Sequence, residues 1–418
     1  MEKTNDPIVM ENIIVGFNIS SLTSGIIALK NREDCMIITD NDVFEYLNLE
    51  RDCILTEYDC KILDKIKINV NKVPLRDLEL KLKDKKELNI STDKLYIANK
   101  QDIIRNLLEI YTNLGGEISE RTEITGVEGK SVIVNNNYYC EYDKLLITGP
   151  NSSITPYINM VKRKQEFKDA LNFFIRVKNV EKTKASCKLE IDGPLDYDYL
   201  LNNREYTTIG VVYNLESNPY WEIEQDKVIK EIKNRLIDMS NRVNYIDKDE
   251  FNKKIKDFET KINEFMNQDI EINLAKDKLQ EYFELLSYSP DNVNRTIHFY
   301  KDSFLFGSRF GTSNPLTGMG VGYEILSAYD ILKDIKNNKL SESNTYKDKL
   351  ISLNILYRRI FKSLFSKSIL NYINNREKFT EYVINNMILN ENNEKYSLKE
   401  FLKCRKDFKK EIIDGKQQ

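Results

Sequence analysis

Glycine carries the first chemical signal in this sequence. The chain has 15 glycines in 418 residues, yet Gly318, Gly320 and Gly322 lie within five positions, directly before a run with helical periodicity. Backbone without side chains at the start of a helix lets an anionic group approach the free N–H groups of the first turn. Taken alone, the stretch is typical of a phosphate-binding loop.

A second glycine turn lies near the start of the chain. An apolar run ends at Gly16, helical spacing follows, and a second apolar run over residues 35–40 ends in Asp40. This order predicts a βαβ unit in which a pyrophosphate sits at the helix N-terminus and Asp40 accepts from a ribose hydroxyl. Asn18 and Ser21 occupy the second and third glycine positions of the pattern G-x-G-x-x-G, so a βαβ unit without a nucleotide is an equal alternative.

The sequence contains few residues that could carry out other kinds of catalysis. His298 is the one histidine, and the alternation around it predicts a strand and a structural role, which nearly excludes triads and histidine-rich metal sites. The six cysteines are scattered without a C-x-x-C pair, so we expect no metal site and a reducing, cytoplasmic location. A net charge of −3 gives no reason to expect nucleic acid. If the chain is an enzyme, a cofactor should carry the reaction.

Hydrophobic periodicity predicts two kinds of architecture in one chain. Residues 101–118 predict an amphipathic helix, and residues 144–149 and 303–308 predict short buried strands that run to a glycine. From about 155 to 300, alternating segments predict a second sheet, with a charged helical segment at 243–285. The first and last thirds therefore have nucleotide-binding character, and a different sheet interrupts them.

The C-terminal part predicts helices, one of which is basic. Residues 349–376 contain six basic residues and no acidic one beside an apolar stripe. Such a helix can lie on an anionic membrane surface as a peripheral contact. We favour the alternative, a helix docked on the protein with its basic face in solvent. No apolar run reaches the roughly 20 residues of a membrane span.

Three motifs, in this order, resemble the flavoproteins of the para-hydroxybenzoate hydroxylase and geranylgeranyl reductase group. They are the first glycine turn, the loop GPNSSITPYI at 149–158, and GSRFGTSNPLTGMG at 307–320. The motif NPLTGxG is most similar to that of geranylgeranyl reductases, and the resemblance covers about residues 10–340. It implies an α/β fold, α+β overall, in which a Rossmann-like FAD-binding domain is interrupted by a mixed-sheet substrate domain and followed by a helical C-terminal region. The implied boundaries are 1–60, 96–155 and 301–340 for the FAD-binding domain, 61–95 and 156–300 for the substrate domain, and 341–418 for the helical region.

The resemblance also implies which residues contact FAD. The first glycine turn would lie under the pyrophosphate, Asp40 would meet the adenosine ribose, and Lys100 stands where the family often has an arginine near the cofactor. Ser308 takes the place of an aspartate that binds the ribitol, and the backbone before Gly320 would pass along the isoalloxazine. The full implied set is Gly16, Phe17, Asn18, Ser20, Ser21, Asp40, Lys100, Gly149, Gly307, Ser308, Pro315, Gly318, Met319 and Gly320, with no metal ligands.

The function that the resemblance implies is an FAD-dependent oxidoreductase. Reduced flavin would deliver hydride to a double bond of an isoprenoid or another apolar substrate, and NADPH or another reductant would supply the electrons. Cys53, Tyr197 and Tyr199 are the candidates for catalytic or substrate-lining groups. The alternatives are a flavin monooxygenase, and a non-catalytic descendant of the fold that binds a lipid or a protein partner.

Overall fold

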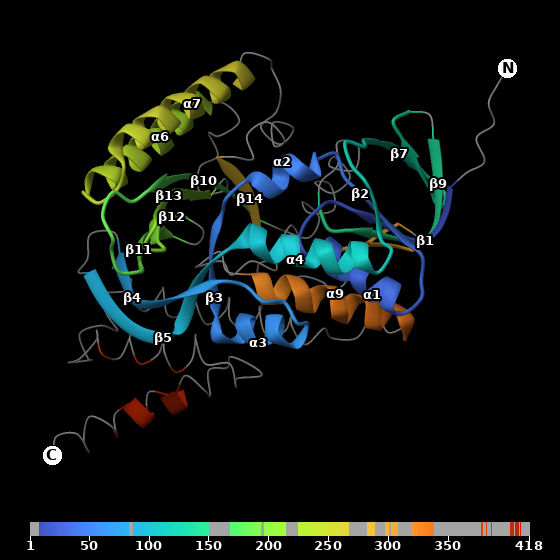
Figure 1. The fold of residues 1–418 in the computed structure, drawn as a ribbon, viewed down its shortest axis with the longest axis horizontal. Helices are drawn as coiled ribbons and strands as arrows, with labels where there is room; N and C mark the ends of the chain where they lie inside the picture. Colours follow the sequence, from blue (N-terminus) through green and yellow to red (C-terminus); the bar gives the residue numbers. More distant parts are fainter. Residues whose placement is uncertain are drawn as a thin grey trace.

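Two eight-stranded sheets, here called sheet A and sheet B, form the framework of the molecule (Figure 1). The structure is a computed structural model. It describes residues 8–82, 87–136, 138–149, 168–193, 196–214, 225–266, 282–288, 297–300, 302–307 and 320–337, and single positions at 378, 382, 386, 402–404, 406–408 and 410.

Sheet A has a parallel centre with the strand order β16-β9-β1-β2-β6. These strands are β1 (Ile8–Val15), β2 (Cys35–Ile38), β6 (Glu117–Ser119), β9 (Tyr138–Ile147) and β16 (Ser303–Leu305). Antiparallel strands extend it, namely β7 (Ile124–Glu128), β8 (Ser131–Val134) and β15 (Ile297–Tyr300). The apolar runs of the sequence lie in the centre because parallel strands are covered on both faces. The predicted strand around His298 is confirmed, since His298 lies in β15.

Helices from distant parts of the chain share one face of sheet A (Figure 1). They are α1 (Ile19–Lys30), α3 (Glu57–Lys65), α4 (Lys100–Asn113) and α9 (Val321–Lys336), with the short α2 (Val43–Asn48) beside them. Tyr111 of α4 fixes the packing, because its ring fills the space that side chains at Gly25 and Gly116 would need. The Tyr111 hydroxyl donates to the carbonyl of Glu117 at 2.8 Å, and this ties α4 to β6.

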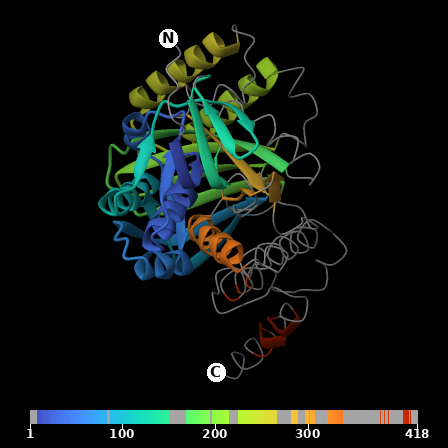
Figure 2. The ribbon, with the colours of Figure 1, turned by 90° about the vertical axis from the view of Figure 1, so that its right-hand side faces the viewer.

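Sheet B forms the second layer and has its own helical cover. Its order is β14-β10-β13-β12-β11-β4-β5-β3, antiparallel except for the pair β11–β4. The strands are β3 (Asp52–Thr56), β4 (Lys72–Leu82), β5 (Glu87–Asn99), β10 (Lys168–Lys178), β11 (Ser186–Gly193), β12 (Asp196–Asn202), β13 (Tyr206–Asn214) and β14 (Phe283–Tyr288). Helices α6 (Gln225–Asn241) and α7 (Lys248–Met266) pack on one face and lie well apart from α9 in both views (Figures 1 and 2).

The charged segment predicted as helical over 243–285 contains helix α7 and departs from the prediction at its end. Phe251 and Phe258 of α7 are almost completely buried against sheet B, so α7 is an amphipathic cover for the sheet and only its outer face is solvated. At the end of the segment, residues 283–285 belong to strand β14, which pairs with β10. Pairing with a buried strand outweighs the local helical periodicity there.

Sheet B curves so that β3, at one end of the strand order, lies close to β10, near the other end. The carboxylate of Asp52, at the start of β3, is 1% exposed and accepts from Arg176 Nε of β10 at 2.9 Å. It also accepts from Asn203 Nδ2 and from Thr208 Oγ1, each at 2.9 Å. Three donors satisfy a buried charge that would otherwise be costly. The cluster brings the start of β3, and the residue before it, Arg51, against the concave side of sheet B.

Candidate functional site

The carboxyl edge of sheet A brings together glycines from three strands. Gly16 follows β1, Gly149 follows β9, and Gly307 follows β16. Gly16 has φ +102°, and a Cβ built there would lie 2.7 Å from the Cα of Gly149. Gly307 has φ +91°, and its Cβ would lie 2.8 Å from Ser20 Oγ. A Cβ at Gly16 or Gly307 would clash with its neighbours, and one at Gly149 would lie 3.1 Å from the Cα of Gly16, so the predicted glycines form one closely packed cradle at the strand ends.

The cradle lies where the strand order changes direction. From β1 the chain continues to β2 on one side, while β9 and β16 lie on the other side. In open parallel sheets this switch point at the carboxyl ends of the strands is the usual place for a ligand. The N-terminus of α1, with Ser20 and Ser21 fully buried, begins there.

Asn18 fills the place of the second glycine with a helix cap. Its Oδ1 accepts from the backbone N–H of Ser21 at 2.9 Å, and the Ser21 hydroxyl accepts from the Asn18 N–H at 2.8 Å. The Asn18 amide also donates to the carbonyl of Thr148 at 3.0 Å, which bridges the ends of β1 and β9. One N–H that a phosphate would use is therefore occupied by a neutral side chain.

A buried polar group that the sequence did not predict lies next to the predicted Lys100. Gln101, at the start of α4, is fully buried and donates through Nε2 to the carbonyl of Tyr46 at 2.6 Å. Its Oε1 has no hydrogen-bond partner among the described residues. The Tyr46 ring meets the edge of Phe17 at 5.4 Å, and this connects the group to the glycine turn. A buried acceptor of this kind is satisfied by a donor from a ligand or from water.

The glycine cradle and the open acceptor of Gln101 both fit a dinucleotide such as FAD along this edge, whereas the Asn18 cap occupies an N–H that the pyrophosphate would use. Arg51 lies between this region and sheet B. It is 7% exposed, and its guanidinium lies 5.6 Å from the Tyr46 ring and 5.5 Å from the Phe174 ring. Arg51 and Gln101 lie in polar stretches without a motif, so only the folded chain indicates their place.

The other predicted cofactor residues divide into two sets. Asp40 is half-buried two residues beyond β2, at the same edge as Gly16, whose N–H donates to Ile38 O at 2.9 Å. Lys100 is half-buried at the start of α4, and Gly320 caps α9. Ser308, Pro315, Gly318 and Met319 lie outside the described residues, as does the basic segment 349–376.

The three candidate catalytic residues do not share one environment. Cys53 of β3 packs against the helical core of sheet A. Tyr197 is 3% exposed in the apolar core on the face of sheet B opposite α6 and α7. Tyr199 is half-buried on that face, and its hydroxyl donates to Asn172 Oδ1 at 3.1 Å. Its ring lies over Gly210, where a Cβ would approach within 2.1 Å. Tyr199 is the candidate whose hydroxyl has a fixed direction.

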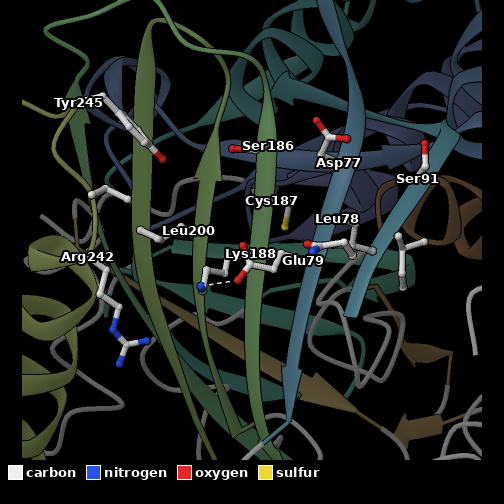
Figure 3. Close-up of a pocket in the computed structure, with 13 residues that line it drawn as sticks. Asp77, Leu78, Glu79, Ser91, Ser186, Cys187, Lys188, Leu200, Arg242 and Tyr245 are labelled. Carbon is white, nitrogen blue, oxygen red and sulfur yellow. Dashed lines mark hydrogen bonds and ion pairs between the residues drawn. The ribbon is translucent and has the colours of Figure 1, made fainter. Parts of the chain in front are cut away.

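A pocket of about 530 Å³ lies elsewhere, on sheet B near the turn between α6 and α7 (Figure 3). Lys188 pairs with Glu79, its direct neighbour across β11 and β4, and Arg242 pairs with Glu190. Burial raises the pKa of Tyr245, whose ring points into the pocket. The other residues that line the pocket include Asp77, Asn89, Ser91, Ser186, Cys187 and Leu200. None of the predicted cofactor residues that the structure describes lines this pocket, so it is distinct from the glycine cradle.

The described part of the chain shows neither a metal site nor a membrane-spanning helix. No group of three or more His, Cys, Asp or Glu side chains is arranged to hold a metal ion there. None of the described helices combines the length and apolar character that crossing a membrane requires.

Comparison with known proteins identifies the fold. No protein-family model matches the chain, and no curated protein matches it. A geranylgeranyl bacteriochlorophyll reductase-like protein from Thermoplasma acidophilum has 13% identity and a TM-score of 0.51, over 95% of this chain and 96% of that one. A flavin-dependent brominase has 10% identity and a TM-score of 0.58, over 97% of this chain and 100% of that one. A flavoprotein/dehydrogenase from Cytophaga hutchinsonii has 10% identity and a TM-score of 0.51, over 92% and 94%.

These similarities define the class of fold to which the chain corresponds. The chain has two sheets, and the one with the parallel centre carries the glycine cradle. This arrangement is a flavoprotein-type α/β fold, so the fold class expected from the three motifs is confirmed. The similarity extends over nearly the whole chain on both sides, so it includes sheet B as well as sheet A.

Proposed function

We propose that the chain is an FAD-dependent oxidoreductase that binds the cofactor along the carboxyl edge of sheet A. The observation that carries the proposal is the cradle of Gly16, Gly149 and Gly307, where the ends of three strands meet beside the N-terminus of α1 and a further side chain would be crowded. Bare backbone beside the N-terminus of α1 suits a pyrophosphate, because N–H groups and the helix dipole favour negative charge. FAD, when bound, would supply reversible hydride transfer.

The chain's own residues would position and enclose the cofactor. Gln101 Oε1 is a buried acceptor that an N–H or O–H of the cofactor would satisfy. Asp40, at the end of β2, suits a ribose hydroxyl. Phe17 and Tyr46 pack edge to face beside the glycine turn and exclude water from it.

The finer proposal is reduction of a double bond in an isoprenoid or another apolar substrate, with NADPH or another reductant as electron donor. Its support is the apolar character of the face of sheet B opposite α6 and α7, where Leu189, Leu201 and Val212 belong to one hydrophobic cluster. On this face the Tyr199 hydroxyl donates its one hydrogen to Asn172 Oδ1, which fixes the position of the Tyr199 oxygen beside the apolar residues. Positioning and exclusion of water would supply most of the rate enhancement. A monooxygenase would use the same cofactor site.

One observation favours a second candidate, a non-catalytic descendant of the fold. The Asn18 side chain already satisfies the N–H of Ser21 and the carbonyl of Thr148, so part of the N-terminus of α1 is capped without a phosphate. A chain that has exchanged a cofactor for internal caps would retain the fold and bind a lipid or a protein partner.

Flavin binding by the wild type and by Asn18→Gly tests both candidates. We expect purified wild-type protein to retain FAD, measured by absorbance after release and by titration of the stripped protein. Asn18→Gly removes the cap and opens the phosphate position, so its Kd for FAD should fall about tenfold. Asn136→Gly, in the hairpin between β8 and β9 with φ +62°, is the matched control and should leave the Kd unchanged.

The outcomes separate the candidates. If neither the wild type nor Asn18→Gly binds FAD, the oxidoreductase proposal is wrong. If only Asn18→Gly binds it, the cap has closed an ancestral site and the non-catalytic candidate is favoured.

A further inference from the structure

The floor of the pocket on sheet B is an array of polar side chains on three adjacent strands. Leu78, Ile90 and Cys187 belong to the apolar core on the opposite face of the sheet. Because side chains alternate along a strand, the residues on either side of these three face the pocket. They form two cross-strand rows, Ser186, Asp77 and Ser91 in one and Lys188, Glu79 and Asn89 in the other.

One wall of the pocket is the turn between α6 and α7, which is fixed to the sheet. The Tyr245 carbonyl accepts from the backbone N–H of Val180 at 2.8 Å. The hydroxyl end of Tyr245 points toward Ser186 (Figure 3). Val243, from the same turn, and Leu200 of β12 also line the pocket. The wall therefore presents an aromatic ring and two aliphatic side chains beside the polar floor, in an arrangement that the fold itself sets.

The charges at the pocket largely compensate one another. Two carboxylates, Asp77 and Glu79, and two cations, Lys188 and Arg242, line it. Lys188 pairs with Glu79, and Arg242 pairs with Glu190, the next residue of β11 on the same face. Neither cation is therefore left for an anionic ligand.

Asp77 differs from the other charged residues of the pocket. It has no hydrogen-bond or ion-pair partner among the described residues. Its side chain is exposed, and a single exposed carboxylate binds a cation weakly in water. Its two oxygens can still accept hydrogen bonds from two neighbouring hydroxyl groups of one ligand, and such charge-assisted bonds are strong for their kind.

We propose that this pocket binds a neutral polyhydroxylated ring, that is, a sugar or the sugar portion of a larger molecule. Each hydroxyl of such a ring donates and accepts, which matches a floor of serine hydroxyls, an amide and a carboxylate. The C–H surface of the ring packs against Tyr245 and Val243. A volume of about 530 Å³ is in the range of small-molecule sites. The proposal is independent of the proposed flavin site, since the two sites share no residue.

Titration of the full chain with neutral sugars tests the proposal, with binding detected by saturation-transfer NMR and the Kd measured by calorimetry. The probes are D-glucose, D-galactose and maltose, and the comparison ligands are cyclohexanol, phosphate and spermidine. We expect saturable binding of a sugar and none of the comparison ligands. Asp77→Ala should raise the Kd for the sugar about tenfold. Asp93→Ala, which removes an exposed carboxylate of β5 outside the pocket, is the matched control and should leave the Kd unchanged.

A second variant, Val243→Ser, acts on the wall and should also raise the Kd, even if Asp77→Ala does not fold. A sugar that binds both variants as tightly as the wild type lies elsewhere, and this result overturns the proposal. Failure of every sugar to bind overturns it as well. Binding of phosphate or spermidine that Asp77→Ala changes, without binding of a sugar, would assign the pocket to an ionic ligand and overturn the neutral one. None of these results depends on whether the chain binds FAD.

Discussion

The two edges of the parallel sheet are held together by different means. At the carboxyl edge, Gly16 and Gly149 place backbone against backbone, with no room for a Cβ. At the amino edge, side chains make the contacts. Asn12 Nδ2 donates to Glu33 Oε2 at 3.0 Å, and Lys144 Nζ lies 2.9 Å from the same oxygen.

The difference indicates which edge is constrained by function. Backbone contacts between glycines stabilise little by themselves, and they cost conformational entropy on folding. Side-chain pairs such as Glu33 and Lys144 stabilise modestly and can be exchanged for other pairs. A ligand that approaches the backbone of the carboxyl edge, as proposed for FAD, is a reason for the sheet to keep the costly arrangement there. If this interpretation is correct, substitutions at the two edges should differ in size and in pH dependence.

The largest effect is expected for Gly16→Ala. A Cβ at Gly16 meets backbone atoms of Gly149, and its φ of +102° is unfavourable for alanine, so the free energy of unfolding should fall by about 3 kcal/mol. Gly115→Ala is the control, because Gly115 has φ +88° with nothing within 4 Å of its Cβ. That variant should lose about 1 kcal/mol from conformation alone. Urea unfolding of both proteins measures the difference, and equal losses would show that the cradle has room for a side chain.

An intermediate effect is expected at the contact between α3 and α9. Gly322→Ala forces its Cβ into Asp59 Oδ1, and we expect a loss of about 2 kcal/mol. In an Asp59→Ala background the carboxylate is absent and only Ile62 opposes the methyl group, so the same substitution should cost clearly less. A double-mutant cycle measured by urea unfolding gives the coupling energy. Additive losses would mean that Asp59 and Gly322 do not constrain one another.

Much of this fold could be predicted from the sequence, because its central elements have strong local signals. The apolar runs before Gly16 and Asp40 predicted β1 and β2, and helical periodicity from residue 101 predicted α4. Local chemistry also accounts for the turn after β8, where Asn135 has φ +49°, a conformation that asparagine tolerates well. In each case the residues that decide the structure are adjacent in sequence.

The residues that could not be predicted depend on contacts between distant segments. Asp59 looks like an ordinary helix-capping residue, and only folding brings it to Gly322. Gln101 looks like a solvent-facing position of an amphipathic helix, yet it is fully buried beside Tyr46. The sequence also predicted Asn18 as a position near a phosphate, but not that its side chain would bridge to the carbonyl of Thr148. Such side chains have no local pattern, since their partners lie on other strands and helices.

The smallest effect is expected at the amino edge, from Glu33→Gln. Burial raises the pKa of Glu33, but hydrogen bonds from Lys144 and Asn12 outweigh it, so the pKa lies below the ordinary value of 4.5. A lowered pKa in the folded state means that the ionised form stabilises the protein above pH 4.5, and that this contribution is lost as the pH falls through the folded pKa. Because both side chains are about one-quarter exposed, Glu33→Gln should lower the free energy of unfolding at pH 7 by about 0.5–1 kcal/mol.

The difference between Glu33→Gln and the wild type should shrink as the pH falls below 4.5, where the wild-type carboxylate also becomes neutral. Urea unfolding at pH 7, 5 and 3 measures this trend. Glu57→Gln is the control. It removes a carboxylate that pairs with Lys61 on α3 and is more exposed than Glu33, so it should change stability by no more than about 0.3 kcal/mol at any of these pH values. A loss from Glu33→Gln that is the same at pH 7 and pH 3 would mean that shape, and not charge, holds the amino edge. The contrast with the glycine cradle would then be one of degree, because both edges would depend on close packing.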